Sequence, residues 1–129
     1  MKTRKGLTVL EVIIVLAVIA TATVLFFIQK LNVDAMNRDA DRKIAINAMF
    51  FSLEEGFFAE HGYYPEVIGP DNLPTMDPNL FTDPAGFLIN TDGSSFIYEP
   101  SNCVDGRCRS YILRAILERE DVFIRQSRH

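Results

Sequence analysis

The N-terminal half of the chain opens with a long apolar segment that carries almost no charge. Residues 7–28 are apolar except for three threonines and one carboxylate, Glu11. About 20 apolar residues are enough to cross a bilayer as a helix, in which the backbone groups bond one another. Three basic residues precede the segment, and a basic flank stays on the cytoplasmic side. The pattern therefore predicts a membrane-spanning helix at residues 7–30, with its N-terminus in the cytoplasm.

Helical periodicity continues beyond this segment. No glycine or proline occurs between Leu7 and Glu55, so the helix is expected to run on into water to about residue 61. Two stripes of apolar residues recur at helical steps and predict one wide apolar face against a core. The first stripe is Val33, Met36, Ala40, Ile44, Ala48, Phe51 and Phe58, and the second is Ile46, Phe50, Leu53 and Phe57. His61-Gly62, with Pro65 close behind, predicts the helix end.

The opposite helix face is predicted to be exposed and charged. The adjacent carboxylates Glu54 and Glu55 are expected on this helix surface. Two further pairs have the i,i+4 spacing that supports an exposed helix: Asp34 with Arg38, and Asp39 with Lys43.

The second half of the chain has the pattern of a loop followed by strands. Residues 62–86 contain five of the six prolines and are predicted to be a loop with turns. Residues 87–125 are predicted to form the strands, and residues 126–129 are expected to fray. The expected strands are residues 87–90, 95–99, 109–118 and 122–125. The stretch 109–118 alternates only imperfectly, so its pattern also fits a helix.

Composition limits the size of the soluble part and shows an uneven charge. The chain has 129 residues and a formal net charge of −4, so residues 31–129 form one small domain at most. Residues 30–100 hold 12 acidic and 4 basic residues, whereas residues 101–129 hold 4 acidic residues and 6 arginines. This asymmetry fits arginines that solvate strand faces, complementary contact between stacked subunits, or a weak surface for polyanions.

The carboxylate within the apolar segment needs an explanation, because a charge inside a membrane helix is costly. If the chain is cut between Gly6 and Leu7, the new α-amino group of Leu7 is charged at neutral pH and lies one helical turn from Glu11. Glu11 can then pair with its own terminus or with that of the next identical chain in a stack. The simpler interpretation is that Glu11 lies among the lipid headgroups and reaches water.

A short basic leader is followed by Gly6-Leu7-Thr8-Val9-Leu10-Glu11, which resembles the class III signal of type IV pilins and secretion pseudopilins. The resemblance implies that a prepilin peptidase removes residues 1–6 and methylates the amine of Leu7. It implies that Glu11 neutralises a neighbour's N-terminus during assembly. It also implies a pilin-like α+β fold, in which the long N-terminal helix packs on a small antiparallel sheet. The chain departs from the family pattern at Leu7, where phenylalanine is commonest, and at Ile28, where many members carry a helix-breaking proline.

An ordinary secretory signal is the main alternative at this end of the chain. Ala20-Thr21-Ala22 has the A-x-A form of a signal peptidase site. However, the chain remains apolar from Val24 to Ile28, and Glu11 interrupts the apolar core that such a signal needs. The pattern therefore favours a retained membrane helix.

The two cysteines, Cys103 and Cys108, flank a stretch that contains the turn-forming pair Asp-Gly. If the domain lies outside the membrane, oxidation to a disulfide is expected, and it closes a small loop at a hairpin tip. Free thiols are the alternative. Metal binding is a poor alternative, because two cysteines without two further Cys or His ligands nearby make an incomplete zinc site.

No residue pattern indicates catalysis or a cofactor, and the chain is not expected to be an enzyme. His61 and His129 have no recognisable catalytic neighbours, and the sequence contains no phosphate-binding glycine loop. No metal site is predicted either. Four aspartates are candidates for calcium, although their spacing matches no known calcium loop: Asp77, Asp83, Asp92 and Asp105.

The resemblance gives the functional expectation. The chain is expected to be a structural subunit of a type IV pilus-like filament, with copies of itself, the prepilin peptidase, and an assembly platform with its ATPase as partners. It would lie in the cytoplasmic membrane before assembly and in an extracellular filament afterwards. The alternatives are a type II secretion pseudopilin, a monomeric membrane-anchored domain, and a DNA-uptake pilin whose arginines contact phosphates. The candidate DNA contacts are Arg107, Arg109, Arg114, Arg119 and Arg125.

Overall fold

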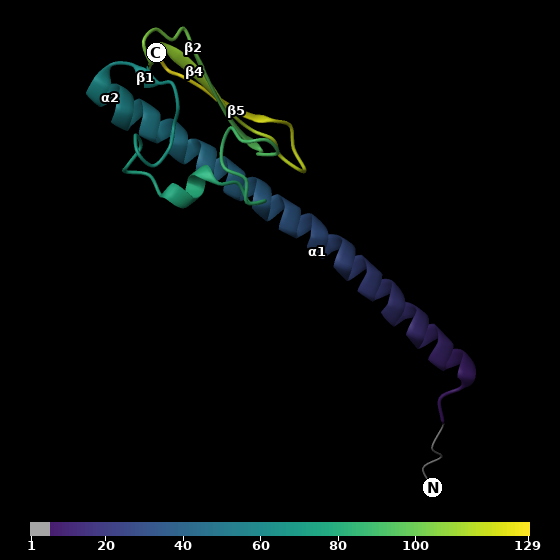
Figure 1. Cartoon of the computed structure of the whole chain (residues 1–129). Helices are drawn as coiled ribbons and strands as arrows, with labels where there is room; N and C mark the ends of the chain where they lie inside the picture. Colours follow the sequence, from purple (N-terminus) through teal and green to yellow (C-terminus); the bar gives the residue numbers. More distant parts are fainter. Residues whose placement is uncertain (1–5) are drawn as a thin grey trace. The chain divides into compact units, whose positions relative to one another are not determined.

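The structure is a computed structural model of the chain, and it describes residues 6–129 (Figure 1). Residues 1–5, which make up most of the predicted leader, lie outside the described residues. The chain divides into two compact units, residues 1–34 and 35–129. The fold class is α+β, as predicted, with one long N-terminal helix and small antiparallel sheets.

The long helix is built from three consecutive segments. Helix α1 spans Val9–Phe51 and continues through a π-helical turn, Ser52–Phe57, into α2, Phe58–His61. The helical run is continuous for 53 residues, and both of its ends lie within two residues of the predicted ones. It ends where Gly62 adopts a left-handed conformation with φ of 78° and donates its N–H to the carbonyl oxygen of Phe58 at 2.7 Å. Residues that carry a Cβ atom rarely adopt this backbone conformation, which explains why the position is a glycine.

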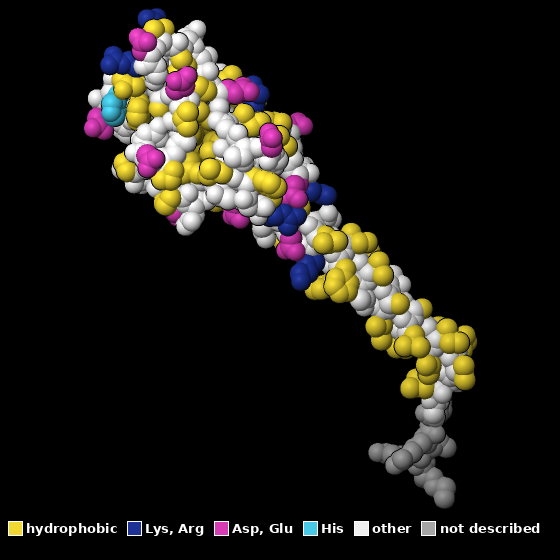
Figure 2. All heavy atoms as spheres, viewed as in Figure 1, with side chains coloured by type: hydrophobic (Ala, Val, Ile, Leu, Met, Phe, Trp, Pro, Cys, Tyr) yellow, Lys and Arg dark blue, Asp and Glu magenta, His cyan; other side chains and the backbone are white. Residues whose placement is uncertain are grey.

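The first part of α1 is apolar and uncovered. Every side chain from Leu7 to Leu31 is exposed in the single chain. Figure 2 shows this stretch as a helix whose surface carries many hydrophobic side chains. Among the described residues, this helix is the one that is long and apolar enough to cross a membrane. The structure thus agrees with the predicted span in length and composition.

The two apolar stripes in the second part of the helix have different environments. Ile46, Phe50 and Leu53 of the second stripe are at most 4% exposed, whereas Met36 and Ile44 of the first stripe are each 59% exposed. The expectation of one wide buried face is therefore wrong. At about 100° per residue the two stripes lie roughly 140° apart around the helix, so a core on one side cannot cover both.

The main sheet is antiparallel, with strand order β2-β4-β5. Its strands are β2, Phe96–Ser101, β4, Ser110–Ala115, and β5, Phe123–Gln126. In β4, Tyr111, Leu113 and Ala115 are buried and the residues between them are less so, which is the alternation of a strand. The strand interpretation is thus confirmed for residues 110–115, whereas residues 116–118 lie outside β4. The other two strands lie within two residues of their expected positions.

The connection between helix and sheet contains two short elements. Strand β1, Tyr64–Pro65, follows the helix exit, and a 3-10 helix, η2, spans Pro78–Phe81. Strand β1 pairs antiparallel with β3, Arg107–Cys108, in the hairpin between β2 and β4. This pairing fixes the hairpin against the end of the long helix.

Residues 87–90 do not form the expected strand. The carboxylate of Asp83 accepts hydrogen bonds from the backbone N–H groups of Ala85 and Phe87, at 3.0 and 2.9 Å. These bonds close a turn, so residues 87–90 keep only a single bridge, from Leu88, to the preceding chain. Local side-chain hydrogen bonding thus prevents a regular strand here.

The core of the domain lies between the buried helix stripe, the loop and the inner face of the main sheet (Figure 1). Aromatic side chains dominate it, and four of them are at most 1% exposed: Tyr64, Phe81, Phe96 and Tyr111. Large aromatic side chains bury much apolar area each, which suits a domain of this small size.

Candidate functional site

The predicted cleavage site lies just before the helix. Gly6, Leu7 and Thr8 precede the first helical residue, Val9, and have no regular secondary structure. Leu7 is 75% exposed, so the bond between Gly6 and Leu7 is accessible on both sides.

Glu11 lies in the first turn of α1 and forms a capping box with Thr8. The Thr8 backbone N–H and hydroxyl donate to Oε2 of Glu11 at 2.8 and 3.0 Å, and the Glu11 N–H donates to the Thr8 hydroxyl at 3.2 Å. These bonds satisfy N–H groups that have no partner within the helix. Thr-x-x-Glu is the usual sequence signal for this arrangement. The capping role of Thr8 was missed at the sequence level, although that signal is present in the chain.

The capping box adds to the predicted role of Glu11. In the uncut chain the nitrogen of Leu7 is a neutral amide, and the Glu11 carboxylate is held at the helix start by Thr8. The N–H that donates to the Glu11 carboxylate is that of Thr8, in the peptide bond between Leu7 and Thr8. An amine created at Leu7 would therefore lie one residue before this donor. The structure therefore places Glu11 next to the predicted terminus and keeps it at the first helical turn.

Cys103 and Cys108 form the predicted disulfide, with their Cα atoms 3.9 Å apart. The turn between them has Asp105 and Gly106 at its centre, with φ of 51° and 75°. Two residues in succession with positive φ are typical of a type I′ hairpin turn. The residues on either side of this pair exchange two backbone hydrogen bonds of 2.9 and 3.0 Å. The expected turn at the hairpin tip is thus confirmed.

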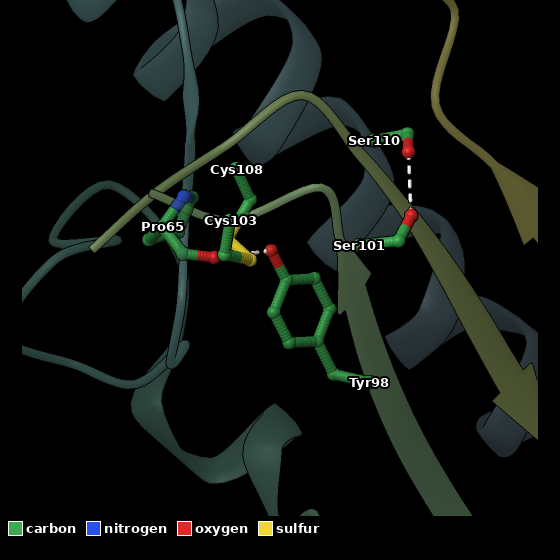
Figure 3. Close-up of a disulfide and its surroundings, with 6 residues drawn as sticks. All are labelled: Pro65, Tyr98, Ser101, Cys103, Cys108 and Ser110. Atoms are coloured by element: carbon green, nitrogen blue, oxygen red, sulfur yellow. Dashed lines mark hydrogen bonds between the residues drawn. A yellow bond between two sulfur atoms is a disulfide. The ribbon is translucent and has the colours of Figure 1, made fainter. Parts of the chain in front are cut away.

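The disulfide lies in a hairpin that other contacts also hold (Figure 3). Cys108 is buried. The Tyr98 hydroxyl donates to the carbonyl oxygen of Pro65 at 2.6 Å, and the hydroxyls of Ser101 and Ser110 are 2.5 Å apart across the two strands. The position of the hairpin therefore does not depend on the disulfide alone.

Asp39 and Arg42 are buried on the helix face that contacts the turn after β4, at 3% and 6% exposure. Nη1 of Arg42 lies 3.1 Å from Asp39 and 2.9 Å from Glu118. The Asp39 carboxylate also accepts the backbone N–H groups of Glu118 and Arg119, each at 2.8 Å. Burial raises the pKa of Asp39, but these hydrogen bonds and Arg42 outweigh it and hold the pKa below its ordinary value. This cluster fixes the end of β4 to the helix.

The expected surface pair between Asp39 and Lys43 is therefore wrong. Lys43 pairs with Glu120, and Arg38 donates to Glu118 at 2.8 and 2.9 Å. Hydrogen bonds from Arg38 and from the buried arginine beside it lower the pKa of Glu118 to about 2. The helix charges thus pair with the connection between β4 and β5 and bring the sheet onto the helix.

Glu54 is buried at 5% exposure, which corrects the prediction that it lies on the helix surface beside Glu55. Its carboxylate accepts hydrogen bonds from the hydroxyls of Tyr64 and Tyr111 at 2.9 and 2.7 Å. Burial, together with these bonds to a carboxylate, raises the pKa of both tyrosines, so their hydroxyls remain donors. Glu54 lies within the π-helical turn, Ser52–Phe57, which shifts the helical register here. This turn was not predicted from the sequence.

The last residues do not fray as expected. The Ser127 N–H donates to the carbonyl oxygen of Tyr111 at 3.1 Å, and the Arg128 N–H donates to Glu54 at 3.1 Å. The ring of His129 stacks on Phe58 with centroids 4.2 Å apart. Glu54 thus fixes this terminal segment to the helix, a contact between residues too distant in sequence for a pattern to reveal.

Two of the five arginines proposed to contact DNA are already bound within the domain. Arg114 pairs with Glu99 at 2.8 Å, and Arg125 donates to Asn47 at 2.9 Å. Arg125 also lies over the ring of Phe50, 5.0 Å from its centroid. These side chains are already bound within the domain, so they do not offer a row of free cations to a phosphate backbone.

The four aspartates considered for calcium are not gathered into one site. The carboxylate of Asp83 is buried and accepts four hydrogen bonds, from three backbone N–H groups and the hydroxyl of Ser95. Burial raises the pKa of Asp83, but these bonds outweigh it and lower the pKa below its ordinary value. Asp77 accepts the N–H of Asn79 at the start of η2. No group of three or more His, Cys, Asp or Glu within residues 6–129 is arranged to hold a metal ion.

The residues with a predicted role thus fall into two sites. Gly6, Leu7 and Glu11 lie together at the helix start, and the two cysteines lie at the hairpin tip. Comparison of the chain with protein-family models, with curated proteins and with solved structures finds no match. The function must therefore be inferred from these residues and from the surfaces that the fold leaves uncovered.

Proposed function

We propose that this chain is the structural subunit of a type IV pilus-like filament, which polymerises through its N-terminal helix. The observation that carries the proposal is Glu11, the one charged residue among residues 7–28, in the first turn of an exposed apolar helix. Cleavage after Gly6 creates an amine one turn from this carboxylate. A charge pair between neighbouring chains then selects their axial register, while the apolar surface supplies contact area.

The exposed apolar surface of residues 7–31 supports a role in membrane and filament. An uncovered surface of this size is not stable in water and marks a region that lipid or other chains cover. A bilayer covers it before assembly, and the same surface packs against copies of itself afterwards. Between apolar helices, packing and paired polar groups drive association. Glu11 is the polar group available here.

The exposed stripe in the domain half of the helix supports contact between copies outside the membrane. Met36 and Ile44 are each 59% exposed and Phe51 is 44% exposed, on the side of the helix that the sheet leaves uncovered. Exposed apolar residues that recur along one helix face are typical of a surface that a partner covers. A second copy of this chain presents the same face.

The disulfide supports the location of the domain outside the cytoplasm. Disulfides form and persist in oxidising compartments and are rare in the cytosol. The proposal therefore places the N-terminus in the cytoplasm before processing and the domain beyond the membrane. Its partners are the prepilin peptidase, which cuts after Gly6 and methylates Leu7, and an assembly platform with its ATPase.

Two measurements on cells test this function. Intact-mass analysis of the mature protein should give a chain that begins at methylated Leu7. A chain that still begins at Met1, or that begins at Thr23, contradicts the proposal. Electron microscopy of cells with and without this chain should show surface filaments only when the chain is present. Loss of protein secretion with no surface filaments in either strain would support the secretion pseudopilin in its place.

A further inference from the structure

A cleft of about 970 Å³ opens at the end of the domain, where the helix exit meets the disulfide hairpin. Three separate segments line it: the helix end with Phe58 and His61, the hairpin with Arg107 and Arg109, and the terminal segment with His129. Its volume is at the upper end of the range for small-molecule sites. The cleft lies outside the two surfaces used in the proposed filament contact.

The side chains that line the cleft include two guanidinium groups and one carboxylate, in a domain that is acidic overall, and the carboxylate of Glu66 lies beside the hairpin turn. Among the residues that line it, Asp105 is the one carboxylate, against the two guanidinium groups of Arg107 and Arg109. Within residues 6–129, neither of these arginines has an ion-pair partner. Arg107 lies over the ring of Tyr63, 5.2 Å from its centroid, so its donors remain available at the edge of the cleft. Available guanidinium groups favour a ligand that carries a carboxylate or a phosphate.

Aromatic rings give the cleft fixed walls. His129 stacks on Phe58 with centroids 4.2 Å apart, and Phe58 in turn stacks on Tyr64 at 4.8 Å. Tyr64 is bound to the buried carboxylate of Glu54, so the stack is connected to the core. On the other wall His61 stacks on Phe57 at 4.2 Å, and its Nδ1 lies 3.0 Å from the carbonyl oxygen of that residue. A preformed site of this kind loses little entropy when it orders a ligand.

We propose that this cleft binds a carboxylated sugar unit of an acidic polysaccharide. The guanidinium groups of Arg107 and Arg109 bind the carboxylate, and the exposed face of the imidazole of His129 takes the apolar face of the sugar ring. The amide of Asn102, which also lines the cleft, is a partner for sugar hydroxyls. The combination of guanidinium, amide and flat ring surfaces in one cleft matches the three kinds of group that such a sugar carries.

A nucleic acid fits the same observations less well. DNA carries one negative charge per about 1.7 Å and needs a series of cations along its backbone. Only two arginines line the cleft, and Arg114 and Arg125 are bound elsewhere in the domain. The domain also has more carboxylates than basic residues, which repels a dense polyanion. A sugar polymer with widely spaced carboxylates brings a single anion to the cleft.

The test uses the full chain in detergent micelles, with trigalacturonate as the probe and its methyl ester as the uncharged counterpart. Calorimetric titration should show saturable binding of trigalacturonate and none of the ester. Arg107→Gln and Arg109→Gln should each weaken binding about tenfold or more, as expected for the loss of hydrogen bonds to a charged group. Arg119→Gln, which removes an exposed arginine outside the cleft, should leave binding unchanged.

A measurement on the unmodified chain keeps the test independent of the variants' folding. In NMR titrations, trigalacturonate should shift the ring signals of His61 and His129. The proposal is overturned if these signals do not move at millimolar probe, if the ester binds as well as the acid, or if the Arg119 variant loses as much affinity as the cleft variants. It is also overturned if a single-stranded oligonucleotide moves these signals and trigalacturonate does not, because the cleft then serves nucleic acid. None of these outcomes depends on filament formation.

Discussion

The charged side chains in the two parts of the long helix have opposite environments. In residues 9–34 the apolar side chains face outward and the one acid of the apolar segment, Glu11, is bound locally by Thr8. In residues 35–61 three charged groups, Asp39, Arg42 and Glu54, are buried against other elements. The apolar surface of the first part has no cover within the described part of the chain, whereas the buried charges of the second part find their partners within it. Polarity in the sequence therefore does not by itself tell which side chains meet solvent.

The largest expected effect tests the first part of this comparison. Glu11→Gln keeps the shape of the side chain and removes its charge, so under the proposed function the Leu7 amine of a processed chain would be left unpaired in a low-dielectric filament interior. Membrane insertion and cleavage should be unharmed, because the apolar segment and the scissile bond are unchanged. Assembly should fail or slow markedly. The readout is immunoblotting for processed subunit in membranes together with a count of filaments by electron microscopy.

Thr8→Val is the control that separates capping from charge pairing. It removes the hydroxyl of the capping box and keeps the carboxylate of Glu11, at a cost of about 1 kcal/mol to the helix start. Filaments should persist in this variant, and they should also persist in Glu60→Gln, which removes an exposed carboxylate from the domain. Filaments of normal number in Glu11→Gln, or their equal loss in Thr8→Val, would show that pairing with the terminus is not the function of this carboxylate.

The next largest effect tests the second part, in which charges are buried. Asp39→Asn removes one of the two carboxylates that pair with Arg42, leaves Glu118 as the remaining partner, and weakens the bonds to the turn after β4. Removing one member of a buried ion pair costs about 3–5 kcal/mol, and the remaining pair with Glu118 places the expected loss at the lower end of this range. Chemical denaturation of the domain should show a loss of this size, whereas Asp71→Asn, at an exposed loop position, should change little. Equal stability of the two variants would mean that the cluster does not hold the sheet to the helix.

The same cluster predicts how stability depends on pH. The pKa of Glu118 is lowered from 4.5 to about 2, and that of Asp39 lies below its ordinary 3.8. A group whose pKa is lower in the folded state stabilises the fold above its unfolded pKa and loses that contribution as pH falls toward the folded one. Stability should therefore fall between about pH 4.5 and pH 2, and the fall should be smaller in Asp39→Asn. Melting temperatures measured across this range check the sign.

The features that depend on local chemistry alone were predictable from the sequence. Length and periodicity predicted the helix limits, because a run without glycine or proline followed by Gly62 is a local signal. The disulfide and its turn were predicted for the same reason. The choice between the two apolar stripes was not, because both repeat at helical spacing and only the position of the sheet decides which of Ile44 and Ile46 is covered.

The buried polar groups could not be predicted from local sequence patterns. Asp39 is satisfied by N–H groups of residues 118 and 119, and Glu54 by Tyr64 and Tyr111, all of which the fold brings from other parts of the chain. The cleft between the helix exit and the disulfide hairpin was missed for the same reason, because its three segments meet only in the folded domain. In the N-terminal site, by contrast, Gly6, Leu7 and Glu11 lie within about one helical turn of one another. Their proximity therefore follows from sequence spacing alone.

Matched substitutions compare the two helix faces directly. Ile46 is fully buried and Ile44, two residues earlier, is 59% exposed. Ile46→Ala should destabilise the domain by about 2–5 kcal/mol, as large-to-small core substitutions do, whereas Ile44→Ala should change it by at most about 0.5 kcal/mol. Chemical denaturation of the full chain in detergent gives both values. In assembled filaments Ile44→Ala should have a clear effect of its own. It removes contact area between copies and should therefore lower the melting temperature of the filament. If Ile44→Ala affects neither the domain nor the filament, the exposed stripe has no partner.

The smallest effect concerns the hairpin tip, which is held in more than one way. Cys103→Ser opens the disulfide at its exposed end and leaves Cys108 in the core, so the loss is that of loop closure, about 2–3 kcal/mol in the chain-entropy model. The fold should survive, because the β1–β3 pairing and the hydrogen bond from Tyr98 to Pro65 still hold the hairpin to the helix exit. Thermal denaturation should show a lower midpoint with an unchanged native spectrum.

Hydrogen exchange in Cys103→Ser should quicken at residues 104–107 and stay slow in β4. Ser101→Ala, which removes the nearby hydroxyl pair and keeps the disulfide, is the matched control and should leave exchange at the tip unchanged. Alkylation of both cysteines in native protein without reductant would contradict the disulfide itself. Unfolding of the domain in Cys103→Ser would show that the pairing with β1 is too weak to hold the hairpin alone.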